Sequence, residues 1–348
     1  MEKCLVVLTP GFPSDEYDTT CVPAVQNFVR AACKIYPGRN ILVIAFQYPF
    51  EEKIYHWNGV EVIALGGKNR AGFLRVITWI KAYKTLKKIC KSYRHIALLS
   101  FWMTECALIG KHFGRKKQLG HITWLQGQDA LKTNRYVKRI RPAAESVVAI
   151  SCTNQRVFFE NHGVMPAHVI ENGVIEKQFP ELNTSERQID ILGVGSLTEG
   201  KNYALFLEIA AKLQVKYPRL TCVIAGDGPL TATLKKQAKT LGLRNIRFTD
   251  LIAHSQVLEL MNNSRIFLHT SGYEGSSSAM IEALYSGCKV VARQPLSDHI
   301  VKNLYVADSQ NELIKITEKL LSLSEKPERV LFNSMEDSAK KIIELLND

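Results

Sequence analysis

The segment from Glu274 to Glu282, with the sequence EGSSSAMIE, carries the residue types best suited to chemistry. An apolar run at 266–270 precedes it and is typical of a buried parallel strand. The apolar residues from Met280 onward predict a buried helix. The glycine and serines between them would then lie at a strand-to-helix turn, where free backbone N–H groups suit an anion such as a diphosphate.

Two carboxylates flank this turn. We expect Glu274 just ahead of the anion site and Glu282 about two turns along the helix, among apolar neighbours. A buried carboxylate needs a partner, and sugar or ribose hydroxyls would serve as donors to both groups. Two structural roles remain open: Glu274 as a carboxylate at a helix start, and Glu282 in an internal ion pair.

Two further loops predict the same kind of ligand. GVGSLTEGKN at 193–202 and AGDGPL at 225–230 each follow a predicted strand. Ligands of open α/β sheets bind beyond the carboxyl ends of the strands, so these loops and the Glu274 turn would line one crevice. Lys201 would supply a point charge for a nucleotide diphosphate.

The first of these loops has a rival interpretation. Gly195, Gly200 and Lys201 nearly match a P-loop, which would make the protein an NTPase. Asn202 stands where a P-loop has the Ser or Thr that holds magnesium. The predicted strand at 266–270 is followed by Ser271, where an NTPase would have an acidic residue at the strand end. A turn without any ligand is a third possibility for this loop.

Apolar runs of strand length alternate with helical patterns along the whole chain. Strands are predicted at 5–8, 41–46, 60–64, 96–100, 121–126, 147–151, 189–194, 221–225, 246–249, 266–270 and 289–292. Helices are predicted at 22–34, 72–94, 104–113, 203–216, 230–241, 256–263 and 277–286, and a last amphipathic segment spans 329–346. Such alternation predicts an α/β protein with two doubly wound parallel sheets, divided between residues 161 and 187.

The composition indicates a globular protein of 348 residues with an apolar fraction of 46%. The eight cysteines form no CxxC pair and no cluster of zinc spacing, which favours reduced thiols in the cytoplasm. The apolar run at the N-terminus is too short for a signal peptide, and no run has the length of a transmembrane helix.

The formal charge of +12 is unevenly distributed, with eight basic residues and no acid between Arg70 and Arg94. Apolar residues recur there every three or four positions, which predicts an amphipathic helix with a core face and a basic outer face. The apolar set is Phe73, Ile77, Ile80, Tyr83, Leu86, Cys90 and Tyr93. The basic face would meet an anionic membrane or simply water. No zinc finger or RNA-binding signature indicates a nucleic-acid partner.

Residues 189–293 resemble the retaining, nucleotide-sugar-dependent glycosyltransferases of family 4, which have the GT-B fold. The resemblance lies in an ordered set of elements. They are GSLxxxKN at 195–202, AGDGPL at 225–230, NIRFTD at 245–250, SGYEG at 271–275, EA at 282–283 and GCKVV at 287–291. ENGV at 171–174 resembles the turn between the two domains of the family, and TPGFP at 9–13 more loosely resembles its opening loop.

The resemblance implies two Rossmann-like domains facing an interdomain cleft. Residues 1–165 would bind the acceptor, residues 166–328 the nucleotide sugar, and residues 329–348 would form a helix crossing back to the first domain. Its implied donor contacts are Lys201 on the diphosphate, the backbone of Gly275, Ser276 and Ser277 on phosphate and sugar, Glu282 on the ribose, and Gly11, Ser196, Gly226, Leu251 and Ile252 around the nucleotide. Glu274 would contact the donor sugar on its reacting side. No metal and no cofactor are implied.

Two residues depart from the family pattern. Ser196 stands where the family usually has Arg, so one cation on the diphosphate is missing. Gln126 stands where the family commonly has His, and a glutamine can bond a sugar hydroxyl but cannot carry a proton. We count Gln126 with Glu274 as candidate catalytic residues. A noncatalytic GT-B partner subunit is therefore an alternative, although both glutamates are present.

The sequence thus predicts a retaining glycosyltransferase that moves a sugar from a nucleotide-diphosphate donor to a glycan or lipid-linked acceptor. Cell-surface polysaccharide synthesis, in the cytoplasm or at the inner face of the membrane, is the expected setting. The base and the sugar of the donor are not encoded in these patterns.

Overall fold

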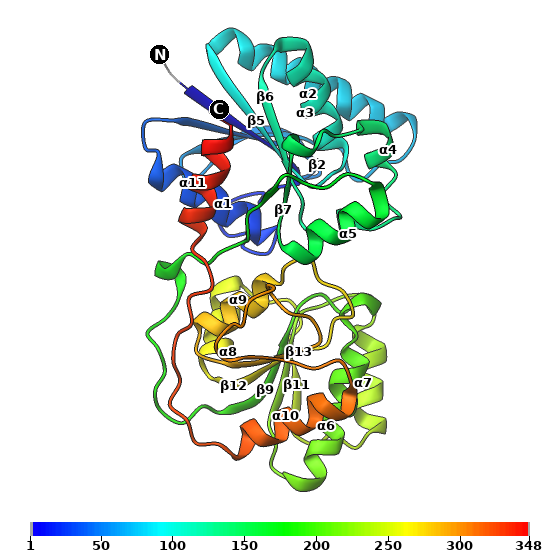
Figure 1. Cartoon of the computed structure of the whole chain (residues 1–348), viewed down its shortest axis with the longest axis vertical. Coiled ribbons are helices and arrows are strands. Elements are labelled where there is room, and N and C mark those ends of the chain that lie inside the picture. Colours follow the sequence, from blue (N-terminus) through cyan, green and yellow to red (C-terminus); the bar gives the residue numbers. More distant parts are fainter. Residues whose placement is uncertain (1–2, 347–348) are drawn as a thin grey trace. The chain divides into compact units, whose positions relative to one another are not determined.

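The computed structural model describes residues 3–346 and divides the chain into two compact units (Figure 1). Met1–Gly173 and Met335–Asp348 form the first unit, and Val174–Ser334 form the second. The chain therefore passes between the units twice. The crossings fall eight and six residues after the boundaries expected at 165/166 and 328/329.

The first unit is built on a sheet with the strand order β3-β4-β2-β1-β5-β6-β7-β8 among the described residues. The strands are β1 (Lys3–Gly11), β2 (Asn40–Tyr48), β3 (Glu52–Trp57), β4 (Val60–Leu65), β5 (His95–Phe101), β6 (Gly120–Trp124), β7 (Val147–Ala149) and β8 (His168–Val169). Every pair is parallel except β3 with β4. The edge strand β3 was not predicted from the sequence.

Helices cover both faces of this sheet (Figure 1). They are α1 (Pro23–Ile35), α2 (Phe73–Ser92), α3 (Glu105–Lys117), α4 (Tyr136–Ile140), α5 (Cys152–His162) and α11 (Met335–Leu345). α2 and α3 pack on one face through Leu86 and Phe113. The last helix, α11, contacts α1, so the C-terminal segment belongs to the first unit. Its helix begins at Met335, later than the predicted 329.

The predicted core face of α2 is wrong for its first half. Phe73, Ile77 and Ile80 are 79%, 39% and 50% exposed. The buried positions of the helix are instead Thr78, Ala82, Leu86 and Ile89. Periodicity indicated an amphipathic helix here, but it did not indicate that a polar side of the first turns would face the protein.

The second unit contains a parallel sheet with the order β11-β10-β9-β12-β13-β14 among the described residues. The strands are β9 (Ile189–Val194), β10 (Cys222–Ala225), β11 (Ile246–Phe248), β12 (Ser264–His269), β13 (Lys289–Ala292) and β14 (Leu304–Val306). The helices are α6 (Tyr203–Lys216), α7 (Thr231–Thr240), α8 (His254–Asn262), α9 (Ser278–Tyr285) and α10 (Gln310–Ser322). α6, α7 and α10 cover one face, while α8 and α9 cover the other (Figure 1).

Strand order fixes where ligands can bind in each unit. In the second unit, β9 lies between β10 and β12, so the connections leave β9 in opposite directions on its two sides. In the first unit, β1 holds the same position between β2 and β5. Such switch points open a crevice at the carboxyl ends of the strands. The predicted pair of doubly wound domains is confirmed.

Candidate active site

The turn after β12 lies at the switch point of the second unit. It joins His269, the last residue of β12, to α9, which begins at Ser278. Ser277 caps this helix, and its hydroxyl accepts from the backbone N–H of Met280 at 3.4 Å. The helix N-terminus therefore stands at the carboxyl edge of the sheet, as the sequence predicted.

Glu274 is the most closely surrounded carboxylate of this turn. It forms an ion pair with the ammonium of Lys201, and its Oε1 lies 3.7 Å from Nε2 of His269. Burial alone would raise the pKa of Glu274, but His269 and Lys201 hold that pKa below its ordinary value. Glu274 is therefore ionised at neutral pH. Nδ1 of His269 is buried and has no hydrogen-bond partner within residues 3–346.

Lys201 reaches Glu274 because the loops after β9 and β12 are bonded to each other. The Thr270 hydroxyl donates to the carbonyl of Lys201 at 3.0 Å, and the N–H of Gly272 donates to the carbonyl of Gly200 at 3.4 Å. The sequence placed Lys201 and Glu274 in one crevice. The structure joins them directly.

The two glycine-rich loops pack without space for side chains. Gly226 has φ +138°, and a Cβ placed there would lie 2.0 Å from the carbonyl oxygen of Gly195. The N–H of Gly195 donates to the carbonyl of Ala225 at 3.0 Å. Glycine is needed at Gly226 for this close backbone approach. The N–H of Gly226 also bonds the carbonyl of Asp250 at 3.0 Å, which places the predicted base-binding loop beside it.

Glu282 lies one turn into α9, not two, and is buried. Its Oε1 lies 2.9 Å from Nε2 of His254, the first residue of α8. This histidine was not singled out from the sequence, where a lone His at a predicted helix start carries little signal. His254 orients one oxygen of Glu282.

The remaining predicted donor residues lie on the same edge. Ser196 and Leu251 are exposed, and Ile252 is half-buried. Gly275 is buried, and the Ser276 hydroxyl oxygen is buried without a hydrogen-bond partner in the described chain. An unpaired buried hydroxyl at a helix N-terminus can hydrogen-bond a ligand.

Arg293 is a cation that the sequence interpretation missed. It follows β13, and its Nη1 lies 4.0 Å from the position that a Cβ would take on Gly272. The backbone N–H of Arg293 donates to the carbonyl of His269 at 3.3 Å. The adjacent strand thus brings a guanidinium close to the Glu274 turn, where Ser196 supplies no charge.

The predicted residues of the first unit lie at its own carboxyl edge. Gly11 is the last residue of β1 and is buried. Gln126 follows β6, and its side-chain Nε2 is buried without a partner in the described residues. Its backbone N–H donates to Oδ1 of Asp129 at 3.0 Å. Asp129 therefore shapes the loop that carries Gln126.

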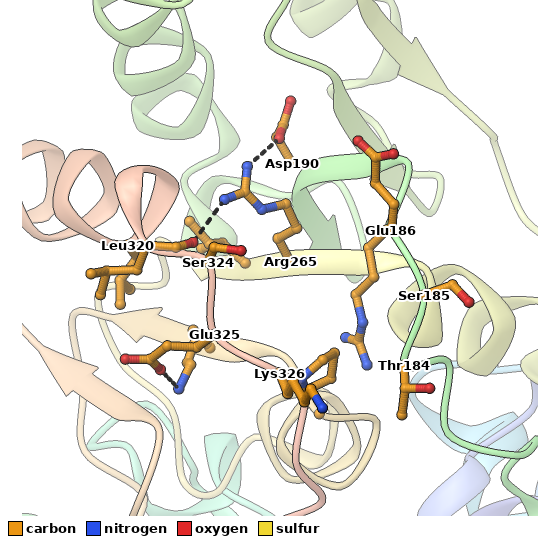
Figure 2. A pocket seen from close by; sticks show the side chains of 15 residues that line it. Thr184, Ser185, Glu186, Asp190, Arg265, Leu320, Ser324, Glu325 and Lys326 are labelled. Carbon is orange, nitrogen blue, oxygen red and sulfur yellow. Dashed lines mark hydrogen bonds and ion pairs between the residues drawn. The ribbon is translucent and has the colours of Figure 1, made fainter.

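A separate pocket of about 550 Å³ lies at the opposite edge of the second sheet (Figure 2). Asp190, Arg265 and Lys289, at the starts of their strands, line it. Arg265 bonds Asp190 at 3.0 Å and Lys289 pairs with Glu325, so these cations are already neutralised by the protein. This pocket is not at the ligand edge of the sheet.

Within residues 3–346, no three His, Cys, Asp or Glu side chains are grouped so that they could hold a metal ion. None of the helices in this range combines the length and hydropathy required to cross a bilayer. All eight cysteines, which lie in the described range, are free thiols.

Comparison with known proteins identifies the second unit. Residues 174–334 match the family model of glycosyl transferases group 1, and this range is the whole second unit but less than half of the chain. A 2-deoxystreptamine N-acetyl-D-glucosaminyltransferase of Niallia circulans is 28% identical over 103 residues, which are 29% of this chain and 26% of that protein.

A second curated relative, from Campylobacter jejuni, matches more of the chain. This N-acetylgalactosamine-N,N'-diacetylbacillosaminyl-diphospho-undecaprenol 4-alpha-N-acetylgalactosaminyltransferase is 24% identical over 231 residues, 60% of this chain and 62% of that protein. The chain thus spans about a quarter of the length of the Niallia relative and about three fifths of the length of the Campylobacter relative.

Solved structures show the fold of the whole chain. Anabaena HepE, in complex with UDP and glucose, matches with a TM-score of 0.70 at 18% identity and covers 100% of both chains. A UDP-forming trehalose-phosphate synthase from Burkholderia vietnamiensis matches with a TM-score of 0.66 at 10% identity, over 100% of this chain and 94% of that one. The fold of the chain is GT-B. Its second unit is similar to the glycosyl transferases group 1.

Proposed function

We propose that this chain with the GT-B fold is a glycosyltransferase, which transfers a sugar from a nucleotide-diphosphate donor with retention of the anomeric configuration, as in family 4. The observation that carries the proposal is the pairing of Lys201 with Glu274 at the switch point of the second unit, beside the N-terminus of α9. One cation, one ionised carboxylate and the N-terminus of a helix are the groups that such a donor requires.

The donor diphosphate would compete with Glu274 for Lys201. Negative charge accumulates on the diphosphate as the sugar leaves, and fixed donors at that place lower the barrier. Lys201, Arg293 and the N–H groups of the α9 turn would supply them. The buried, unpaired hydroxyl of Ser276 supports a polar ligand at this turn.

Glu274 would act as a negative charge and hydrogen-bond acceptor on the donor sugar. The neighbouring Lys201 and His269 keep its pKa low, so it is not a proton donor at neutral pH. The leaving diphosphate would take the proton of the acceptor hydroxyl on the same face, without a metal. Gln126 would hydrogen-bond a sugar hydroxyl. Its amide cannot act as an acid or base, so it would not take part in the proton transfer.

Glu282 would hold the ribose hydroxyls with the oxygen that His254 leaves available. His254 fixes the carboxylate at 2.9 Å, which reduces the freedom lost when the ribose binds. Leu251 and Ile252 would contact the base. UDP is the first nucleotide to test, since Anabaena HepE was solved with UDP.

A glycan or lipid-linked acceptor at the first unit, in cell-surface polysaccharide synthesis at the cytoplasmic face of the membrane, completes the proposal. The Campylobacter relative is named for a sugar-diphospho-undecaprenol, which supports the lipid-linked class. The basic residues between Arg70 and Arg94 support an anionic surface nearby.

The deciding experiment combines a thermal-shift screen with donor hydrolysis by the purified protein. We expect one diphosphate among UDP, GDP and ADP to stabilise the protein selectively, and its sugar conjugate to be cleaved with and without a chelator. Nucleotide binding without cleavage would indicate the noncatalytic subunit, and ATP cleavage would indicate the NTPase. Arg293→Gln should lower donor cleavage, whereas Arg244→Gln, an exposed arginine after α7, should not.

A further inference from the structure

The solvent-facing side of α2 has two chemically different halves. Its exposed stripe begins with apolar side chains and continues with lysines. The apolar half holds Phe73, Leu74, Val76, Ile77 and Ile80, and the basic half holds Lys84, Lys87, Lys88 and Lys91. Single exposed apolar side chains are ordinary on protein surfaces, but a contiguous cluster indicates an interaction site.

The inward side of the same two turns is polar. Nε1 of Trp79 donates to Oε2 of Glu105 at 3.2 Å, and Nε of Arg75 lies 3.5 Å from the same oxygen. Glu105 is buried, and it also accepts from the side-chain amide of Gln47 and, at 3.3 Å, from the hydroxyl of Tyr136. The first half of α2 is therefore anchored to the protein by polar contacts.

An ordinary surface helix leaves its polar side in water, whereas these first two turns leave apolar side chains in water and turn Arg75 and Trp79 inward, the latter also packing on the core. The apolar half is exposed although the helix is firmly attached to the protein, because Arg75 and Trp79 fix its inward side. The outward side is thus arranged for a surrounding less polar than water. The lysines that follow on the same stripe have no acidic residue between 70 and 94 to neutralise them within the helix.

We propose that α2 docks the protein on an anionic lipid bilayer, with Phe73, Ile77 and Ile80 entering the interface and the lysines contacting head-group phosphates. The apolar half spans eight residues and about 10–12 Å, a length that fits insertion at the head-group boundary of a helix lying in the membrane plane. Charge complementarity favours a bilayer over a protein partner, because the basic stretch continues the apolar one.

The position of α2 gives this docking a consequence. α2 follows β4, and β4 runs parallel to β2 and β1, so the helix begins at the carboxyl edge of the first sheet. Gly11 and Gln126 lie at that edge. A bilayer bound by the first turns of α2 would present a lipid-linked molecule to the side of the sheet where the acceptor is proposed. Docking itself does not rest on the proposed reaction, because it requires no donor.

The test is sedimentation of the chain with vesicles, for the parent protein, two variants of α2 and two control variants. One variant carries Phe73→Ser, Ile77→Ser and Ile80→Ser, and a second carries Gln at Lys84, Lys87, Lys88 and Lys91. Matched controls remove exposed residues of the second unit: Val215, Ile300 and Leu331 to Ser, and Lys212, Arg219, Lys236 and Lys239 to Gln. Thermal unfolding verifies that each variant is folded.

We expect the parent chain to bind vesicles containing anionic lipid. One part of the binding free energy should be lost on adding salt, and another part should resist salt. The lysine variant should lose the salt-sensitive part, about fivefold in partition coefficient for each lysine at low salt. The serine variant should lose the salt-resistant part, by about tenfold or more. Both controls should bind as the parent does.

Several outcomes would overturn the proposal. They are a parent chain that does not bind vesicles, a serine variant that binds as the parent does, and controls that lose binding equally. Size-exclusion chromatography provides the rival outcome. If the serine variant dissociates an oligomer while vesicle binding is unchanged, the apolar half of α2 is an interface between copies of the chain instead.

Discussion

Lys201 pairs with the carboxylate of Glu274 and would gain a further anionic partner in the proposed donor diphosphate. We expect Lys201→Ala to weaken UDP binding by about 1.5–3 kcal/mol, the range for hydrogen bonds to charged groups, and to leave uridine binding nearly unchanged. Isothermal titration of both ligands measures the difference. Lys212→Ala is the control, because Lys212 is an exposed residue of α6 that contacts none of the proposed donor residues. Equal losses for nucleoside and diphosphate would refute the role of Lys201.

Glu274 and Glu282 should separate turnover from binding. Glu282→Ala removes a buried carboxylate held by His254, and we expect it to weaken nucleotide binding by about 1–3 kcal/mol. Glu274→Gln keeps the shape of the side chain but removes the charge near the reacting sugar, so it should lower kcat with a smaller effect on nucleotide affinity. Donor hydrolysis and nucleotide titration of both variants decide this. Unchanged behaviour of both would place the site elsewhere.

The positions of individual candidate residues were predictable where neighbouring sequence constrained them. Glu274, Glu282 and Lys201 stand at fixed spacings from glycines and from predicted strand ends, so their placement at one sheet edge could be predicted without a structure, while their roles stay predictions. His254, His269 and Arg293 have no such local pattern. They reach the site because α8 and the ends of β12 and β13 meet at one sheet edge, which depends on strand order.

Helices and strands were predictable from the sequence where one hydrophobic periodicity was clear. The strand at 189–194, the helix at 203–216 and the turn after β12 correspond to the observed elements within two residues. β3 was missed because its pairing with β4 forms a short antiparallel edge hairpin. The outward apolar side of α2 was missed because its orientation depends on Glu105, a residue of another helix.

Asp129 connects the ends of two strands in the first unit. Its carboxylate accepts from the N–H groups of Met103, Gln126 and Gly127 at 2.9–3.0 Å. Burial raises the pKa of Asp129 to about 6 from an ordinary value of 3.8, although these donors lower it. Between those two pH values the folded chain binds more protons than the unfolded chain, so the contribution of Asp129 to stability falls as pH rises through that window.

The raised pKa of Asp129 therefore predicts how the free energy of unfolding changes with pH. A shift of about two pKa units corresponds to about 3 kcal/mol of unfolding free energy between pH 4 and pH 6. Asp129→Asn does not titrate, so the difference in stability between parent and variant should change by this order across the window. Denaturant unfolding at a series of pH values measures it. A difference that stays constant from pH 4 to pH 7 would contradict the raised pKa.

At the scale of the whole chain, polar turn residues indicated the first crossing between units. Gly163, Pro166 and Gly173 mark the end of the first unit, and the chain leaves it at Gly173. The second crossing was harder to place. Residues 329–334 follow Pro327 and include both apolar and polar side chains, but they form no helix, and α11 begins only at Met335. Amphipathic periodicity alone could not define that start.

Because α11 belongs to the first unit, damage to it should separate the stabilities of the two units. Ile342 and Ile343 are fully buried in this helix, and α11 packs on α1. Replacing one of them by Ala should destabilise the first unit by about 2–5 kcal/mol. UDP, if it binds the second unit as proposed, should raise the unfolding temperature of that unit alone.

Differential scanning calorimetry of Ile342→Ala, with and without UDP, therefore has a specific expected pattern. One transition should move down with the substitution, and the other should move up with UDP. Lys340→Ala provides a control on an exposed position of the same helix and should leave both transitions in place. If Ile342→Ala instead lowers the UDP-sensitive transition as much as the other, the two units unfold together, and the last helix contributes to the stability of the whole chain.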